Sequence, residues 1–137
     1  MKNNPTDGFA VEVTVENARV AGLLCTAFEG GVGYWCRIMG YREPSERRAV
    51  LSPDDGRIVR YADYPLTGGA AVCRLSEEET DEGYSPLVLD RAAIQRGLAL
   101  MPQVAPRHWA DFLDENEDAE TGDVFVQLCL LGEVVYC

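Results

Sequence analysis

A strand passes directly into a helix in Pro86-Leu-Val-Leu-Asp-Arg-Ala-Ala-Ile-Gln-Arg-Gly-Leu-Ala-Leu-Met101, where the chain changes character. The short apolar run 86–89 is typical of a buried strand. Asp90 is a favourable helix N-cap, and small or apolar residues then recur on one helical face: Ala93, Ile94, Gly97, Leu98 and Met101. We expect Pro102 to end this helix, because proline lacks the N–H donor that a helix interior requires.

The sequence before this stretch predicts mainly strands. Residues 9–15 alternate apolar and polar side chains and are rich in β-branched residues, as in a half-buried strand. The other expected strands are 33–39, 48–51, 57–61 and 70–75, and Asp55-Gly56 suits a hairpin turn between the second and third of these.

Helices are expected early in the chain and again at its end. Asn17 can cap a helix that runs to Gly30-Gly31, and Pro106 suits the first position of a short helix before the acidic run 114–120. Thr121 is expected to cap a helix over 122–131 that is apolar nearly all round, with Gly132 as its terminator. The prediction is therefore an α+β fold of one domain (1–137, frayed over 1–8), with a single antiparallel sheet of about five strands, helices packed on one face and a helical C-terminal third.

Charge limits the classes of partner. The chain has 23 acidic and 12 basic residues and a net charge of -11, so its average field repels nucleic acids and anionic membranes and favours a basic protein partner. The beginning of the sequence has no apolar core of a signal peptide, and no apolar run is long enough to span a bilayer. The expected location is the cytoplasm.

Cysteine and histidine usage argues against metal, cofactor and catalytic sites. The five cysteines are odd in number and contain no C-x-x-C pair, and four of them, all except Cys137, are expected to pack in the core. His108 is the only histidine, and a partly exposed position near a helix start is the favoured interpretation. A calcium loop beginning at Asp114 fails, because Ala119 and Phe125 stand where glycine and glutamate are needed. We expect no metal, no cofactor and no enzymatic activity.

Two candidate sites follow from these patterns. The first is an acidic surface that binds a partner, formed by Glu77, Glu78, Glu79, Asp81, Glu82, Asp111, Asp114, Glu115, Glu117, Asp118 and Glu120. The second is a small-ligand site at the glycine-rich turn, where aromatic residues and a carboxylate cluster: Glu29, Tyr34, Trp35 and Arg37.

Three sequence words carry a resemblance that spans most of the chain. Leu24-Cys-Thr-Ala-Phe-Glu-Gly-Gly31 followed by Tyr34-Trp35, then Thr121-Gly-Asp-Val, and finally Gly132-Glu-Val-Val-Tyr136 resemble a group of small acidic proteins encoded by phages, prophages and plasmids. This resemblance implies a mobile-element setting and assigns no activity or site residue. In outline, the chain is also similar to anti-CRISPR and antirestriction inhibitors, several of which compete with DNA phosphates for a basic groove.

The leading hypothesis is accordingly a non-enzymatic inhibitor that binds a basic host protein, such as a CRISPR effector or nuclease subunit, through an acidic surface that imitates DNA. The alternative is a protein that binds or sequesters a nucleotide signal at the glycine-rich turn. A structural or regulatory homodimer is the third hypothesis.

Overall fold

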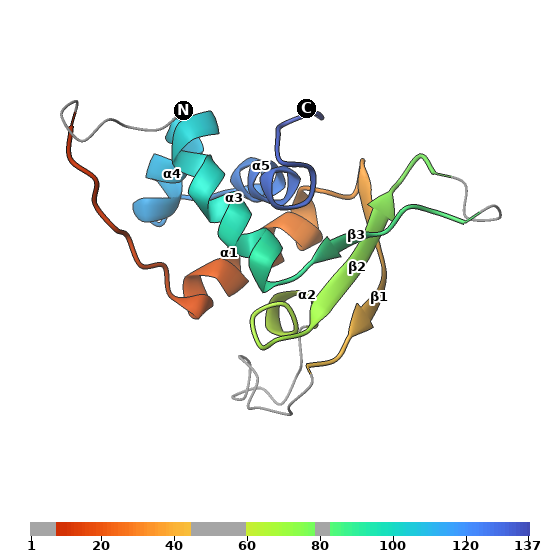
Figure 1. Cartoon of the computed structure of the whole chain (residues 1–137). Coiled ribbons are helices and arrows are strands. Elements are labelled where there is room, and N and C mark those ends of the chain that lie inside the picture. The colour runs from red at the N-terminus through yellow and green to blue at the C-terminus, as the bar shows by residue number, and fades with distance from the viewer. Residues whose placement is uncertain (1–7, 45–59, 79–82) are drawn as a thin grey trace.

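A computed structural model describes residues 8–44, 60–78 and 83–137. The chain is α+β, as predicted, and Figure 1 shows the described helices gathered to one side of the sheet. The elements follow the order α1 (Asn17–Gly30), β1 (Cys36–Arg42), α2 (Arg60–Asp63), β2 (Ala70–Leu75), β3 (Leu87–Leu89), α3 (Arg91–Val104), α4 (Pro106–Leu113) and α5 (Ala119–Leu131).

The sheet has three antiparallel strands in the order β1-β2-β3, so the expectation of about five strands is wrong for the described residues. Ala71 of β2 lies opposite both Tyr41 of β1 and Leu89 of β3. The register shifts between Ile38 and Gly40, which leaves Met39 as a bulge. Because of this extra residue, Ile38 and Tyr41 both pack against the core although three positions separate them.

One continuous hydrophobic core joins the sheet to the helices, and α5 runs through its centre. Every residue of α5 from Thr121 to Cys129 is buried, which agrees with the expected burial of an almost uniformly apolar helix. Two glycines allow its neighbours to approach closely. A Cβ built on Gly122 would lie 2.8 Å from the backbone nitrogen of Ala27 in α1, and one on Gly97 of α3 would lie 2.3 Å from the Sγ of Cys129.

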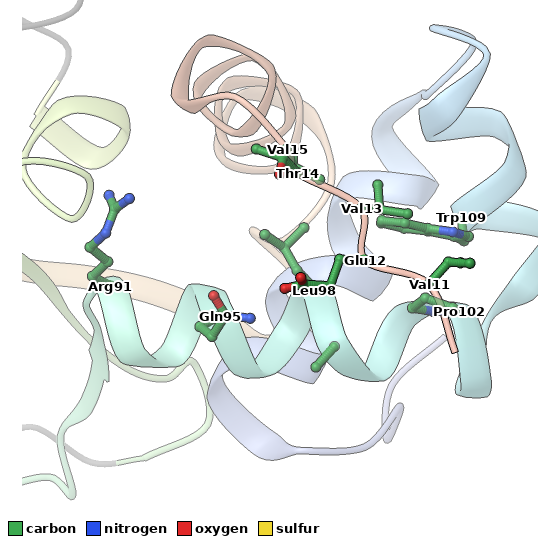
Figure 2. Close-up of a pocket in the computed structure, with 11 residues that line it drawn as sticks. Val11, Glu12, Val13, Thr14, Val15, Arg91, Gln95, Leu98, Pro102 and Trp109 are labelled. Carbon is green, nitrogen blue, oxygen red and sulfur yellow. The ribbon is translucent and has the colours of Figure 1, made fainter. Parts of the chain in front are cut away.

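Three predicted strands need correction. Residues 9–15 are extended but pair with no strand in the part of the chain that the structure describes, where they lie over α3 and α4 (Figure 2). The strand expected over 33–39 begins at Cys36, since Trp35 and Cys36 donate backbone hydrogen bonds to Val32 O and complete the turn after α1. Of the expected hairpin, 48–51 and its turn lie outside the described residues, and Arg60 and Tyr61, assigned to its second strand, begin helix α2.

The helix boundaries are mostly as expected. Asp90 caps α3 by accepting a 2.9 Å hydrogen bond from Ala93 N, and Gly132 ends α5 with a φ of 77°. Asn17 is the first residue of α1 and not its cap, which is Glu16. Pro102 does not end α3: it lies in the last turn, where a single missing N–H costs one hydrogen bond, and the helix continues to Val104.

Candidate functional site

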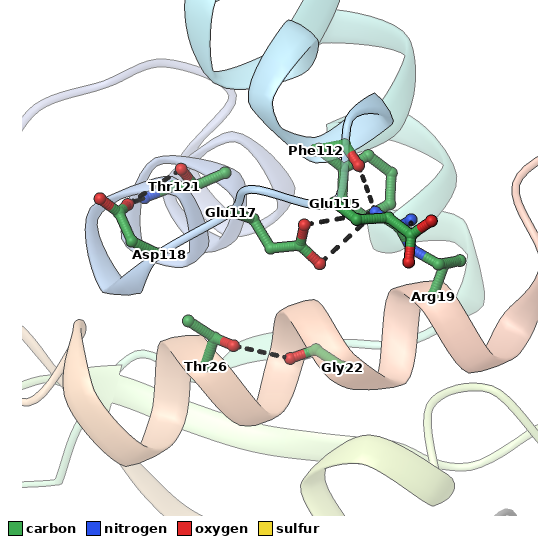
Figure 3. A network of polar contacts seen from close by, with 8 residues as sticks. All are labelled: Arg19, Gly22, Thr26, Phe112, Glu115, Glu117, Asp118 and Thr121. Carbon is green, nitrogen blue, oxygen red and sulfur yellow. Dashed lines mark hydrogen bonds and ion pairs between the residues drawn. The ribbon is translucent and has the colours of Figure 1, made fainter.

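The connection between α4 and α5 and the helix residues beside it form a surface rich in carboxylates, of which Figure 3 shows Glu115, Glu117 and Asp118. We name this surface the acidic corner, formed by Asp111, Asp114, Glu115, Glu117, Asp118 and Glu120. Glu115 has a φ of 61°, in the left-handed region that strains a residue with a side chain. Its side chain is 79% exposed, so the turn presents a carboxylate to solvent at a position where glycine would be less strained.

Arg19 of α1 lies beneath this corner and holds part of it in place. Its guanidinium donates to the carbonyl of Phe112 and lies 3.3 Å from the carboxylate of Glu117, and it is 3.8 Å from that of Glu115. The same group stacks over the Phe112 ring at 4.5 Å from the centroid. A cation from α1 therefore offsets the repulsion among carboxylates that belong to the α4–α5 connection.

Asp118 is the N-cap of α5, which corrects the prediction that Thr121 has this role. The Asp118 carboxylate accepts hydrogen bonds from the backbone N–H and the hydroxyl of Thr121, at 2.9 and 3.0 Å. These bonds hold the pKa of Asp118 below its usual value. His108 of α4 joins the same cluster, because its Nδ1 lies 2.9 Å from Thr121 Oγ1 and its Nε2 lies 3.7 Å from Glu120.

The lowered pKa of Asp118 leads to a prediction for stability against pH. A carboxylate with a depressed folded-state pKa stabilises the fold above its unfolded pKa, near 4, and this stabilisation is lost as pH falls through the folded value. Asp118→Ala should lower the free energy of unfolding by about 1 kcal/mol at pH 7, whereas Asp118→Asn, which retains a good cap, should lower it much less. The free energy of unfolding, measured with denaturant between about pH 2 and 7, should fall less steeply toward acid pH for Asp118→Asn than for the wild type. The same fall with pH in both proteins would contradict this assignment.

The remaining predicted acidic residues lie elsewhere or outside the described residues. Glu77 accepts a 3.1 Å hydrogen bond from the hydroxyl of Tyr136, and Glu78 accepts one from Ser85 N. In Figure 1, the end of β2, which Glu77 and Glu78 follow in the chain, lies on the other side of α5 from α4. The described residues of the predicted acidic surface therefore lie on two separate surfaces and not on one track. Glu79, Asp81 and Glu82 lie outside the described residues.

The glycine-rich turn is filled by the end of the chain. Trp35 is only 2% exposed, because the Tyr136 ring stacks on it at 5.4 Å between centroids. Its Nε1 donates to the carboxylate of Asp123 at 2.7 Å, and the Tyr34 hydroxyl donates to the same group at 2.6 Å. Burial, followed by this hydrogen bond, raises the pKa of Tyr34 to about 12. Gln127 continues the network through hydrogen bonds to Asp123 and to the backbone of Val135 and Tyr136.

Asp123, Gln127 and Tyr136 were not predicted as part of this region. A signal for two of them exists in the sequence, since Asp123 and Gln127 are polar residues four positions apart within 122–131, where the other residues are glycine, cysteine or apolar. The other predicted ligand residues point to different places. Glu29 accepts a hydrogen bond from the Tyr61 hydroxyl, Arg37 is exposed on β1, and Tyr34 helps to line an open cavity of about 280 Å³ beside Cys137.

Three of the five thiols lie in the core. Cys36, Cys73 and Cys129 are buried, Cys25 is half-buried and Cys137 is exposed. A hydrogen bond with Cys36 and burial raise the pKa of Cys73, and burial raises that of Cys129, so both stay protonated and are poor nucleophiles. Within residues 8–44, 60–78 and 83–137, no group of three or more histidine, cysteine, aspartate or glutamate side chains could hold a metal ion. No helix in these ranges is long and apolar enough to cross a membrane.

Charge is distributed unevenly along the chain. The segment 75–137 contains 14 of the 23 acidic residues but only three of the 12 basic ones, Arg91, Arg96 and Arg107. Its excess of acidic residues equals the whole net charge of -11. The acidic corner thus belongs to the part of the chain that provides its negative field.

Comparisons with known proteins give no relative from which a function could be transferred. No family model matches the chain, and no curated protein or solved structure shows significant similarity to it.

Proposed function

We propose that this protein is a non-enzymatic inhibitor, of the kind encoded by mobile elements, that binds a basic nucleic-acid-handling host protein through the acidic corner. A CRISPR effector or a nuclease subunit is the kind of partner that fits this chemistry. The observation that carries the proposal is the support of Glu115 and Glu117 by Arg19, a residue of a different helix. A turn whose shape is fixed before binding loses less conformational entropy when its exposed carboxylates meet a partner.

The corner divides its carboxylates between two roles. Glu117, which is half-buried, is held by Arg19, and Asp118, which is exposed, is held by Thr121 as the cap of α5. Asp111, Asp114 and Glu120 are exposed and do not shape the turn. We expect these three carboxylates to contact the partner, and Glu117 and Asp118 to keep the turn in shape. This division refines the choice of residues for a test, because a change at Glu117 or Asp118 would also disturb the fold.

The alternative proposal, a nucleotide signal bound at the glycine-rich turn, has less support. A base would have to stack on Trp35, and Tyr136 already covers that ring. The phosphate would need Arg37, which lies on β1 and does not line the cavity beside Tyr34 and Cys137.

The test compares two double variants with the same change in charge. Asp111→Asn/Asp114→Asn removes two exposed carboxylates of the corner, and Glu16→Gln/Glu133→Gln removes two exposed carboxylates outside it. We expect the first variant to bind the captured host protein about tenfold more weakly, because two exposed ion pairs contribute about 1 kcal/mol or somewhat more together. The second variant should bind like the wild type.

The measurement is capture from a host lysate, identification of the captured protein, and titration of the purified pair at two salt concentrations. The complex should weaken with added salt, and duplex DNA should displace the host protein. Binding that is indifferent to salt, to duplex DNA and to the corner variant would contradict the proposal.

A further inference from the structure

His108 of α4 meets the beginning of α5 with both of its ring nitrogens. Its Nδ1 lies 2.9 Å from Thr121 Oγ1, and its Nε2 lies 3.7 Å from the carboxylate of Glu120. The His108 side chain is 23% exposed, whereas that of Glu120 is 76% exposed. A ring rotated by half a turn would place carbon atoms toward both groups, so these two contacts determine the orientation of the ring.

The Thr121 hydroxyl determines which nitrogen of the neutral His108 ring carries the proton. This hydroxyl has a single proton and donates it to Asp118 at 3.0 Å, because an ionised carboxylate can only accept. Hydrogen bonds from Thr121 hold the pKa of Asp118 below its usual value, so this carboxyl group is ionised at neutral pH. The hydroxyl oxygen therefore accepts from His108 Nδ1. In the neutral ring, Nε2 then has a lone pair that faces Glu120.

We propose that His108 is a pH-sensitive switch of the acidic corner, which withdraws Glu120 from a partner when Nε2 takes up a proton. Histidine is the side chain that ordinarily changes its charge between about pH 5 and 8. The neutral ring offers Glu120 no donor, so this carboxylate stays available to a basic partner. The protonated ring presents a charged N–H donor to the same carboxylate and pairs with it. The inference rests on the proposed function, because Glu120 is one of the three carboxylates expected to contact the partner.

The charged groups nearest to His108 leave Glu120 as the partner of the protonated ring. On α5, Glu120 faces Nε2, whereas Asp118 lies beyond Thr121 and accepts both of its hydrogen bonds. On α4 itself, one charged residue directly precedes the ring and another follows about one turn later: Arg107 and Asp111.

Charged residues on the other described elements beside α4 are engaged elsewhere. The cations of α1 and α3 each donate a hydrogen bond to a main-chain carbonyl: Arg19, Arg91 and Arg96. Glu12, in the segment that lies over α4, lines the groove beside α3 (Figure 2). Glu120 is therefore the carboxylate that the protonated ring meets.

The expected effect on binding is modest, because Glu120 is exposed to solvent. Ion pairs between exposed groups contribute little, and a single cation added to the corner repels a basic partner by a similarly small amount. We expect the affinity for the host protein to be about threefold lower at pH 5.5 than at pH 7.5.

Nuclear magnetic resonance of the free protein tests the position of the proton. His108 is the only histidine, so the ¹⁵N signals of its ring are assigned directly. Above the pH at which the ring titrates, Nδ1 should be protonated and Nε2 should not. Thr121→Val, which replaces the hydroxyl with a methyl group, should lose this preference. A neutral wild-type ring that is protonated at Nε2 would overturn the assignment.

The ¹³C signal of the Glu120 carboxyl group tests the pairing, again in the free protein. In the wild type it should show its own protonation at acid pH and a further step at the pH at which His108 titrates. His108→Asn is the matched variant, because the asparagine amide can replace Nδ1–H as a donor to Thr121 but has no titratable group. This variant should lack the further step. A step of the same size in both proteins, or in neither, would overturn the switch.

The pH dependence of binding tests the regulatory role, with the host protein that the capture experiment identifies. Between pH 7.5 and 5.5, the wild type should lose about threefold more affinity than His108→Asn, since any titration of the partner is common to both. An equal loss in both would overturn this role. A capture that yields no basic protein would contradict the proposed function alone, because the two measurements on the free protein decide the pairing of His108 with Glu120 independently.

Discussion

Gly122→Val is expected to abolish folding, or to lower the free energy of unfolding by about 3 kcal/mol or more. The added Cβ would lie 2.8 Å from the nitrogen and 2.9 Å from the Cα of Ala27, both backbone atoms of α1. Backbone atoms cannot rotate away as a side chain can, so the two helices would have to separate. Because α5 runs through the core, that separation would expose buried side chains on both helices.

Gly22→Ala provides the matched control for this change. Gly22 lies on α1, is exposed, and has no heavy atom within 4 Å of its Cβ position. Alanine there should raise the free energy of unfolding by about 0.5–1 kcal/mol, because glycine is the poorer helix former. Denaturant unfolding monitored by far-ultraviolet circular dichroism gives both values. A Gly122→Val variant as stable as the wild type would show that α1 and α5 do not cross at this distance.

Gln127→Leu is expected to lower the free energy of unfolding by about 2–4 kcal/mol and to release the end of the chain from Trp35. The Gln127 side chain is fully buried, and its Oε1 accepts from the backbone nitrogens of Val135 and Tyr136 at 2.7 and 2.8 Å. Its Nε2 donates to Asp123 and to Tyr136 O, at 3.0 Å each. Leucine has a similar volume but satisfies none of these groups, so residues 135 and 136 must turn to water.

Fluorescence of Trp35 reports the release separately from stability. In a Trp109→Phe background, Gln127→Leu should shift the emission of Trp35 to the red, because Tyr136 no longer covers the indole. Tyr136→Phe is the control: it keeps the stacked ring, loses only the exposed 3.1 Å bond to Glu77, and should change stability by less than about 1 kcal/mol. Unchanged emission and stability in Gln127→Leu would contradict the role given to this network.

Local signals in the sequence predicted the helix ends at Asp90 and Gly132 and the strands 70–75 and 86–89, but not the caps at Glu16 and Asp118. Asp90 and Gly132 act on helix residues within one turn of their own positions, so the local sequence is enough to identify them. The apolar run 86–89 can also be identified locally, because a strand buried on both sides needs only apolar residues. The segment 9–15 shows the limit of such signals. Its alternation specifies an extended backbone with two different faces, but a strand also requires a neighbour, and the described chain does not supply one.

The candidate site was predictable only in part, for a similar reason. The acidic run 114–120 is visible in the sequence, but its support by Arg19 comes from almost 100 residues earlier in the chain. The aromatic cluster at Tyr34-Trp35 is also visible, but the stacking of Tyr136 on Trp35 depends on how Gln127 holds the last residues. Sequence spacing does not encode contacts of such long range.

The bulge at Met39 has a consequence for the solution behaviour of the sheet. In the described part of the chain, β1 is an edge strand, and an edge with regular free hydrogen-bonding groups is a template for aggregation. Met39 interrupts that regularity, and the exposed cations Arg37 and Arg42 flank it on the same strand. A strand of another molecule is therefore hindered from adding to the β1 edge, which lowers the tendency of this edge to start open-ended fibrils.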